Sequence, residues 1–243
     1  MSDGAVKKVL WWLCLFVAPA VLISIELFHP AGFTKIPGMY QYLHKPQPYD
    51  PQFSALGYFG PQWWFTLHMI QTPMIALIAV GLWLLADRAA AAGTAAVTTV
   101  AWLARFATFV FAVYYTALDS IGGIGMSQSI MLTEQLARDG ALTAEQVQGV
   151  IKVLNGTWTN KWAGGVGSFV SLTGSWAAFA SALVVAVALR LAKKAPWPAL
   201  VLLVAFGWEL QVSHTMPHGP IACALLIVSG LWLWWADRSG VSK

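Results

Sequence analysis

Residues 68–88 read HMIQTPMIALIAVGLWLLADR, and this stretch indicates the class of fold. As a helix, its apolar run is long enough to cross the hydrocarbon core of a bilayer, which takes about 20 residues. Similar runs recur along the chain. The runs predicted to be transmembrane helices are 9–28, 62–86, 98–118, 165–190, 197–213 and 219–236. The sequence therefore predicts an all-α, polytopic membrane protein of six helices, with residues 1–243 forming a single membrane domain.

The composition supports this class. Hydrophobic residues make up 58% of the chain and charged residues only 10%, whereas about 25% of the residues of a soluble domain are charged. The net charge of +4 comes mostly from basic residues between the apolar runs, and they do not form the basic patch of a nucleic-acid-binding protein. The expected partner is the lipid bilayer, and nucleic acid is excluded.

Basic residues flank one set of the expected helix ends. They are Lys7, Lys8, Arg88, Arg190, Lys193, Lys194, Arg238 and Lys243. The positive-inside rule therefore predicts an integral membrane protein with both termini in the cytoplasm. In that orientation the loops 29–61 and 119–164 face outward. The second loop contains two short helical patterns, 127–140 and 142–156, and Thr143 and Gln146 have the spacing of a capping box at the start of the latter.

An internal repeat relates the two ends of the chain. Residues 218–238, HGPIACALLIVSGLWLWWADR, share with 68–88 a first histidine, an early proline, Gly-Leu-Trp-Leu and a final Ala-Asp-Arg. The preceding helices each open with Pro-Ala and contain one glutamate shortly before a histidine. Both pairs have the same expected orientation, so the pattern predicts a parallel repeat of helices one and two with helices five and six.

Ionisable residues gather at the outer ends of these helices. The candidate site residues are His29, His68, His214, His218, Glu26, Glu209 and Asp119. Ionisable groups in membrane helices usually face the bundle interior and pair with one another. The imidazoles and carboxylates suit zinc, iron, copper or manganese, and two of the histidines could instead bind a haem b. His44, in a proline-rich loop, is expected to be structural.

The spacings suggest how these groups are presented. Glu26 and His29 are three residues apart, so on a helix they would point the same way, as in Glu-x-x-His metal ligands. Pro217 interrupts the four-residue spacing of His214 and His218, so a turn is expected to present them. Gln71 and Asp119 are candidate partners that hold the imidazole of a ligand. The small residues of DSIGGIGMSQS (119–129) are expected to lie near the depth of the histidines in the membrane and to allow close helix packing.

Four of these positions look like a known zinc site. A histidine on an early helix, an aspartate on the next and His-x-x-x-His near the last helix resemble the arrangement of the alkaline ceramidases and the related adiponectin receptors; here they are His68, Asp119, His214 and His218. The resemblance implies a zinc-dependent activity on a lipid. The chain departs from this pattern in having six expected helices instead of seven, and Trp64 where that family has a serine.

Three functional hypotheses follow. The leading one is a metal-dependent enzyme, a hydrolase or an oxidoreductase, that acts on a lipid-like or quinone-like substrate from the extracytoplasmic side. In it, His68, His214 and His218 bind the metal and one of the carboxylates acts as general base. The alternatives are a b-type haem subunit for electron transfer and a non-enzymatic assembly or transport subunit of a membrane complex. No nucleotide-binding loop, nucleophile elbow or Cys-x-x-Cys motif supports another class.

Overall fold

The computed structural model describes residues 3–30, 38–44, 47–48 and 58–239, and this part of the chain is largely helical. Its elements are α1 (Asp3–Trp12), η1 (Leu13–Val17), α2 (Ala18–Glu26), α3 (Met39–Leu43), β1 (Gln47–Pro48), β2 (Tyr58–Phe59), α4 (Pro61–Ala90), α5 (Ala95–Leu118), η4 (Asp119–Gly125), α6 (Met126–Arg138), α7 (Ala144–Trp158), α8 (Phe169–Leu191), α9 (Trp197–Val212) and α10 (His218–Ser239). Both η elements are π-helical. β1 and β2 form one antiparallel pair.

Among the described residues, five helices are long and apolar enough to span a membrane. They are Gly4–Glu26, Pro61–Ala90, Ala95–Arg138, Phe169–Leu191 and His218–Ser239. The protein is therefore of the helical membrane class. The expected fifth span corresponds to α9, which is apolar but has only 16 residues, shorter than the usual range of about 17–25. Six spans remain a prediction.

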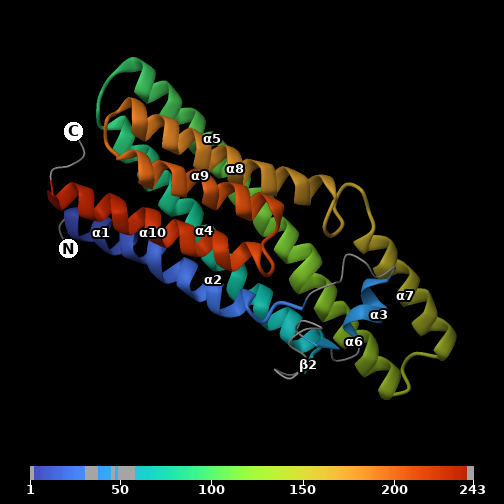
Figure 1. Cartoon of the computed structure of the whole chain (residues 1–243). Helices are drawn as coiled ribbons and strands as arrows, with labels where there is room; N and C mark the ends of the chain where they lie inside the picture. The colour runs from blue at the N-terminus through green and yellow to red at the C-terminus, as the bar shows by residue number, and fades with distance from the viewer. Residues whose placement is uncertain (1–2, 31–37, 45–46, 49–57, 240–243) are drawn as a thin grey trace. The chain divides into compact units, whose positions relative to one another are not determined.

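The chain divides into two compact units. Unit 1 comprises Met1–Leu27, Pro73–Val113 and Thr173–Lys243, and unit 2 comprises Phe28–Thr72 and Tyr114–Leu172. In unit 1, α10 packs along α2 and η1 on one side and along α9 on another (Figure 1). The hairpin of α9 and α10 is the one expected from the short turn between the last two apolar runs.

Two glycines let neighbouring helices approach η1 closely. A Cβ atom on Gly81 would lie 3.1 Å from the Cβ of Cys14, and one on Gly230 would lie 3.2 Å from the ring of Phe16. These glycines occupy equivalent places in the two Gly-Leu-Trp-Leu motifs, and both meet the same π-helical segment. The internal repeat itself, with superposition of the two helix pairs, remains a prediction.

The Ala-Asp-Arg motifs meet at one end of unit 1. Arg88 donates two hydrogen bonds to the carboxylate of Asp237, at 2.7 and 2.5 Å, and one to the carbonyl of Lys194 at 2.7 Å. Arg105 donates to Asp87 at 2.6 and 2.9 Å. Fork-shaped guanidinium groups suit such two-point contacts with carboxylates. The bonded residues therefore share one end of this unit.

In unit 2, a small aromatic core forms where α3 packs against α6 and α7. Buried residues of these helices and of α4 make up this core: Met39, Tyr40, Tyr42, Leu43, Trp64, Met126, Ile130, Ile151 and Leu154. The amphipathic pattern of α6 and α7 explains why they fold here, because each has one apolar face to bury. Trp64 connects this core to the site described below.

The expected end of the third helix at Leu118 is wrong. The helix continues through η4 and α6 to Arg138, so its apolar run extends over Ala95–Arg138. The glycines at 122, 123 and 125 are poor helix formers, and they follow the apolar run at whose end the helix was expected to stop. They are nevertheless helical, and a wider π-helical turn accommodates them.

The predicted capping box at the start of α7 is confirmed. The Thr143 hydroxyl accepts from the Gln146 amide at 3.2 Å, and the Gln146 side chain accepts from the Thr143 amide at 2.8 Å. The helix predicted over 142–156 lies two residues further along the chain, since α7 runs from Ala144 to Trp158. Asn155 bonds to α3: its Oδ1 accepts from the backbone N–H of Tyr40 at 3.0 Å, and its Nδ2 donates to Gln41 at 2.8 Å.

Replacing Asn155 by alanine is expected to loosen α3. The change removes two hydrogen bonds, each worth about 0.5–1.5 kcal/mol, so the Tyr40 amide should exchange its hydrogen on the order of ten-fold faster. Hydrogen exchange measured by mass spectrometry checks this. Gln148→Ala, at an exposed position of α7, is the matched control. Equal protection of Tyr40 in both variants would mean that Asn155 does not hold α3.

Candidate functional site

Two histidines of unit 2 lie ring to ring. His29 follows the end of α2, and His68 lies about two turns into α4, as expected from the sequence. Their exposed fractions are 0% and 4%. The ring centroids are 5.6 Å apart with the planes at 71°, and a ring nitrogen of one lies within 4.8 Å of a ring nitrogen of the other. Buried imidazoles at this separation are close enough to act on one small ligand.

Both rings are held by backbone carbonyls. Nδ1 of His68 lies 2.7 Å from the carbonyl oxygen of Trp64, and Nδ1 of His29 lies 3.0 Å from that of Pro30. A carbonyl oxygen only accepts, so each Nδ1 is the protonated donor, which leaves the lone pair on Nε2. This is the pattern by which proteins orient a histidine that binds a metal through Nε2.

Trp64 is the central residue of this cluster. Its side chain is 2% exposed, and its indole donates to the carbonyl of Gly122 at 3.0 Å. Its ring lies 4.9 Å from His29 and 4.8 Å from His68, centroid to centroid. One residue thus holds His68 through its carbonyl and packs against both imidazoles through its ring.

The π-helical segment η4 forms the wall beside His68. A Cβ atom on Gly123 would overlap the imidazole ring of His68. Only glycine lets the backbone of η4 approach the ring so closely. The glycine cluster was expected to serve close packing at the level of the histidines, and at Gly123 it does so. π-Helical turns frequently occur at functional sites.

Two buried polar side chains of unit 2 have unused hydrogen-bonding atoms. Asp119 is 1% exposed and Gln71 is 0% exposed. Oδ2 of Asp119 and both amide atoms of Gln71 find no hydrogen-bond partner among the residues that the structure describes. Leaving such a group unsatisfied costs about 1–3 kcal/mol, and more for a charged one, so each calls for an explanation such as a water, an ion or a substrate.

Two tyrosines of α3, Tyr40 and Tyr42, add no charge to unit 2. Burial raises the pKa of the Tyr42 hydroxyl. Burial, and then the negative charge of Glu134, raise the pKa of Tyr40. Both tyrosines are therefore neutral at physiological pH. Tyr42 packs edge-on against Trp64 at 6.4 Å, while Tyr40 stacks on His44 at 5.4 Å.

The remaining candidates belong to unit 1. Nδ1 of His218, the first residue of α10, bonds to Oε2 of Glu209 at 2.7 Å. His214 lies in the turn between α9 and α10. A Cβ on Gly219 would overlap the His214 carbonyl oxygen, so the turn needs a glycine there. A turn presents this pair of histidines, as the prolines suggested.

The expected helical pair of Glu26 and His29 is wrong. Helix α2 ends at Glu26, with Leu27 as its C-cap, so His29 lies beyond the helix. Pro30 explains this, because a residue that precedes proline avoids the helical conformation. Glu26 itself is 2% exposed. The three-residue spacing therefore does not place these two side chains on one helical face.

Within unit 2, the ring nitrogens of His29 and His68 lie close enough together to share one metal ion. The sequence predicted His68, His214 and His218 as the metal ligands. In unit 2 the neighbour of His68 is His29, and in unit 1 His218 bonds to Glu209. The sequence analysis noted Trp64 only as a departure from the zinc-site pattern and gave it no role at the site. Its spacing of four residues before His68 was the available signal, since such residues are neighbours on a helix.

No protein-family model matches the chain, and comparison with curated proteins and with solved structures also finds no match. The fold and the site define the class: a helical protein of membrane type with a histidine cluster that could hold a metal ion.

Proposed function

We propose that this protein is a membrane metalloprotein in which His29 and His68 bind one transition-metal ion through Nε2. The observation that supports this most strongly is the pair of Nδ1 hydrogen bonds to the carbonyls of Pro30 and Trp64. In both buried histidines, Nδ1 is used in a hydrogen bond and the lone pair of Nε2 is left to bind a metal. Holding both rings in advance reduces the entropy lost on binding.

The chemistry of the imidazole ligands limits the choice of metal. Imidazole nitrogens suit zinc, iron or copper, so the metal belongs to this group. Asp119, which offers a buried carboxylate oxygen without a partner in the described part of the chain, is assigned the catalytic role below and not a place among the ligands.

The packing around the histidines favours an ion over a haem. Axial histidines lie on opposite faces of a haem, with the flat macrocycle between their rings. Here the ring of Trp64 lies within 4.9 Å of both imidazole centroids, and Gly123 of η4 is packed against His68. A single ion needs only about 2.0–2.1 Å to each nitrogen.

We further propose that the metalloprotein is an enzyme with Asp119 as general base. Asp119 lies four residues before Gly123 in η4, about one turn away, so both belong to the segment packed on His68. A carboxylate beside a metal site can accept a proton from a metal-activated group. A lipid-like or quinone-like substrate is proposed because the helices that carry these residues are of membrane type.

Metal analysis of the purified protein tests this proposal. We expect about one zinc, iron or copper ion per chain by plasma mass spectrometry, and no Soret absorption band. A protein that purifies without metal and takes up none of the three when each is supplied would contradict the proposal. A Soret band with stoichiometric haem would favour the electron-transfer hypothesis instead.

The orientation of the chain is also proposed: both termini cytoplasmic and the histidines toward the extracytoplasmic side. The asymmetric placement of lysine and arginine supports it. Cysteines introduced at Ala92 and Ala141, both exposed, provide the test, because the native Cys14 and Cys223 are buried. An impermeant maleimide added to intact cells should label Ala141→Cys, and should label Ala92→Cys only after lysis. The reverse result would place the histidines on the cytoplasmic side.

A further inference from the structure

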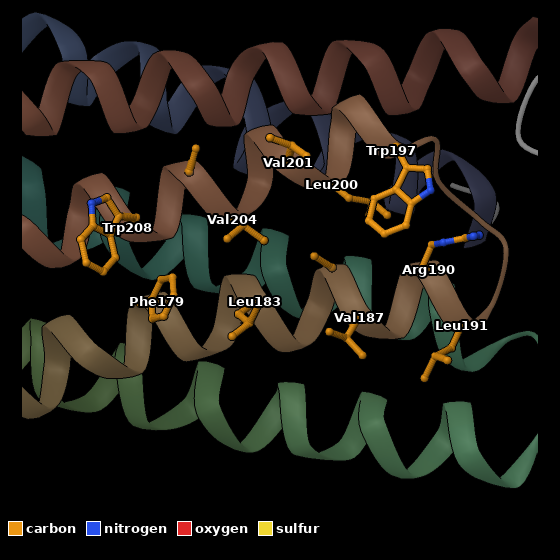
Figure 2. A pocket seen from close by; sticks show the side chains of 12 residues that line it. Phe179, Leu183, Val187, Arg190, Leu191, Trp197, Leu200, Val201, Val204 and Trp208 are labelled. Carbon is orange, nitrogen blue, oxygen red and sulfur yellow. The ribbon is translucent and has the colours of Figure 1, made fainter.

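An apolar groove runs between α8 and α9 within unit 1. Its volume is about 610 Å³, within the range of about 300–1,000 Å³ usual for small-molecule sites. Figure 2 shows side chains of both helices along it, from Phe179 and Trp208 at one end to Arg190 and Trp197 at the other. Leu183, Val187 and Val204 line the part between.

The length of the groove matches one leaflet of a bilayer. The backbones of the two helices touch near the Trp208 end, where a Cβ on Gly207 would lie 3.1 Å from the Cα of Phe179. From Phe179 to Arg190 the helix rises about 16 Å, at about 1.5 Å per residue. The hydrocarbon core is about 30 Å thick, so the groove spans about half of it. An acyl chain of one leaflet fits this length.

Arg190 puts a positive charge at one end of this apolar surface. Its guanidinium carbon lies 4.9 Å above the ring of Trp197, and the residue is exposed. Arg88 and Arg105 each pair with an aspartate, but the structure gives Arg190 no carboxylate partner among the residues it describes.

The charged residues in the sequence around the groove are all basic. Residues 169–208 contain no aspartate or glutamate, and Lys193 and Lys194 follow Arg190 in the turn to α9. Both lysines are exposed. The end of the groove is therefore complementary to an anion, while its walls are complementary to a hydrocarbon chain.

We propose that this groove binds an anionic phospholipid, with one acyl chain along α8 and α9 and the phosphate at Arg190. The guanidinium can donate to phosphate oxygens by two parallel hydrogen bonds. Trp197 holds the guanidinium plane from its ring face. This site is separate from the proposed metal site, and its test does not depend on metal content.

The test is lipid binding by native mass spectrometry, with the full-length protein in detergent and either phosphatidylglycerol or phosphatidylcholine added. Wild type should bind phosphatidylglycerol more tightly. Arg190→Gln should weaken that binding about five-fold, the effect expected of one basic group near anionic lipid. It should weaken phosphatidylcholine binding less, because the choline ammonium offsets the charge of that lipid's phosphate. Val204→Trp, which fills the groove, should weaken the binding of both lipids.

Arg238→Gln is the matched control. Arg238 also stacks on a tryptophan, with its guanidinium carbon 4.1 Å above the ring of Trp234, but it does not line the groove. If Arg238→Gln keeps the wild-type preference for phosphatidylglycerol, the result supports the proposed lipid site. Equal losses in the Arg190 and Arg238 variants, or no loss in Arg190→Gln, would overturn the proposal. Inorganic phosphate that displaces the lipid at equal concentration would also overturn it, because the acyl chain would then contribute nothing.

Discussion

Replacing His68 by glutamine is expected to abolish stoichiometric metal binding. Glutamine has a similar size, but its amide is a far weaker ligand than the Nε2 of a neutral imidazole. Changing a residue that only supports a metal ligand costs about 10–100-fold in affinity, so losing a ligand should cost at least about 100-fold. Metal content by plasma mass spectrometry, after dialysis against a weak chelator, measures the loss.

His44→Ala is the control for this experiment. His44 stacks on Tyr40 at the end of α3, and it is not one of the two histidines proposed to bind the metal. Its replacement should leave the metal content unchanged. Thermal unfolding of both variants separates a lost ligand from a lost fold. Full metal content in a folded His68→Gln protein would show that His68 is a packing residue.

The apolar runs predicted the helices well, because in lipid each backbone polar group has to bond within its own helix. They predicted the end of the third helix poorly. The residues around Gly122 and Gly123 have low helix propensity and lie beyond the apolar run, so they were assigned to an outer loop. Contact with His68 requires a small residue at Gly123, and this requirement of tertiary packing is not visible in a local window of sequence.

The site could be predicted in part. Ionisable residues in apolar segments identified His29, His68 and Asp119, since such groups are costly in a membrane and usually have a role. The sequence could not show which carbonyl orients His68. That carbonyl belongs to Trp64, and side chains that bond back to a carbonyl four residues earlier are better known for serine and threonine. The orientation of the His68 ring depends on its hydrogen bond to this backbone carbonyl, and any residue at position 64 would supply a carbonyl.

Substituting alanine for Gly123 is expected to destabilise the protein and weaken metal binding together. At an ordinary helix position this change stabilises by about 0.5–1 kcal/mol, because alanine loses less conformational freedom on folding. At Gly123 the new Cβ would overlap the imidazole of His68. Overpacking of this kind costs about 1–3 kcal/mol, and the displaced ring would lose its bond to Trp64.

Gly149→Ala is the control for this prediction, and its expected effect on Tm has the opposite sign. Gly149 is also helical, in α7, and a Cβ there would meet nothing within 4 Å. Thermal unfolding should therefore show a higher Tm for Gly149→Ala and a lower Tm for Gly123→Ala, with metal content reduced only in the latter. If both variants are stabilised and retain metal, His68 can move without cost. The close approach of η4 would then not be what positions the imidazole.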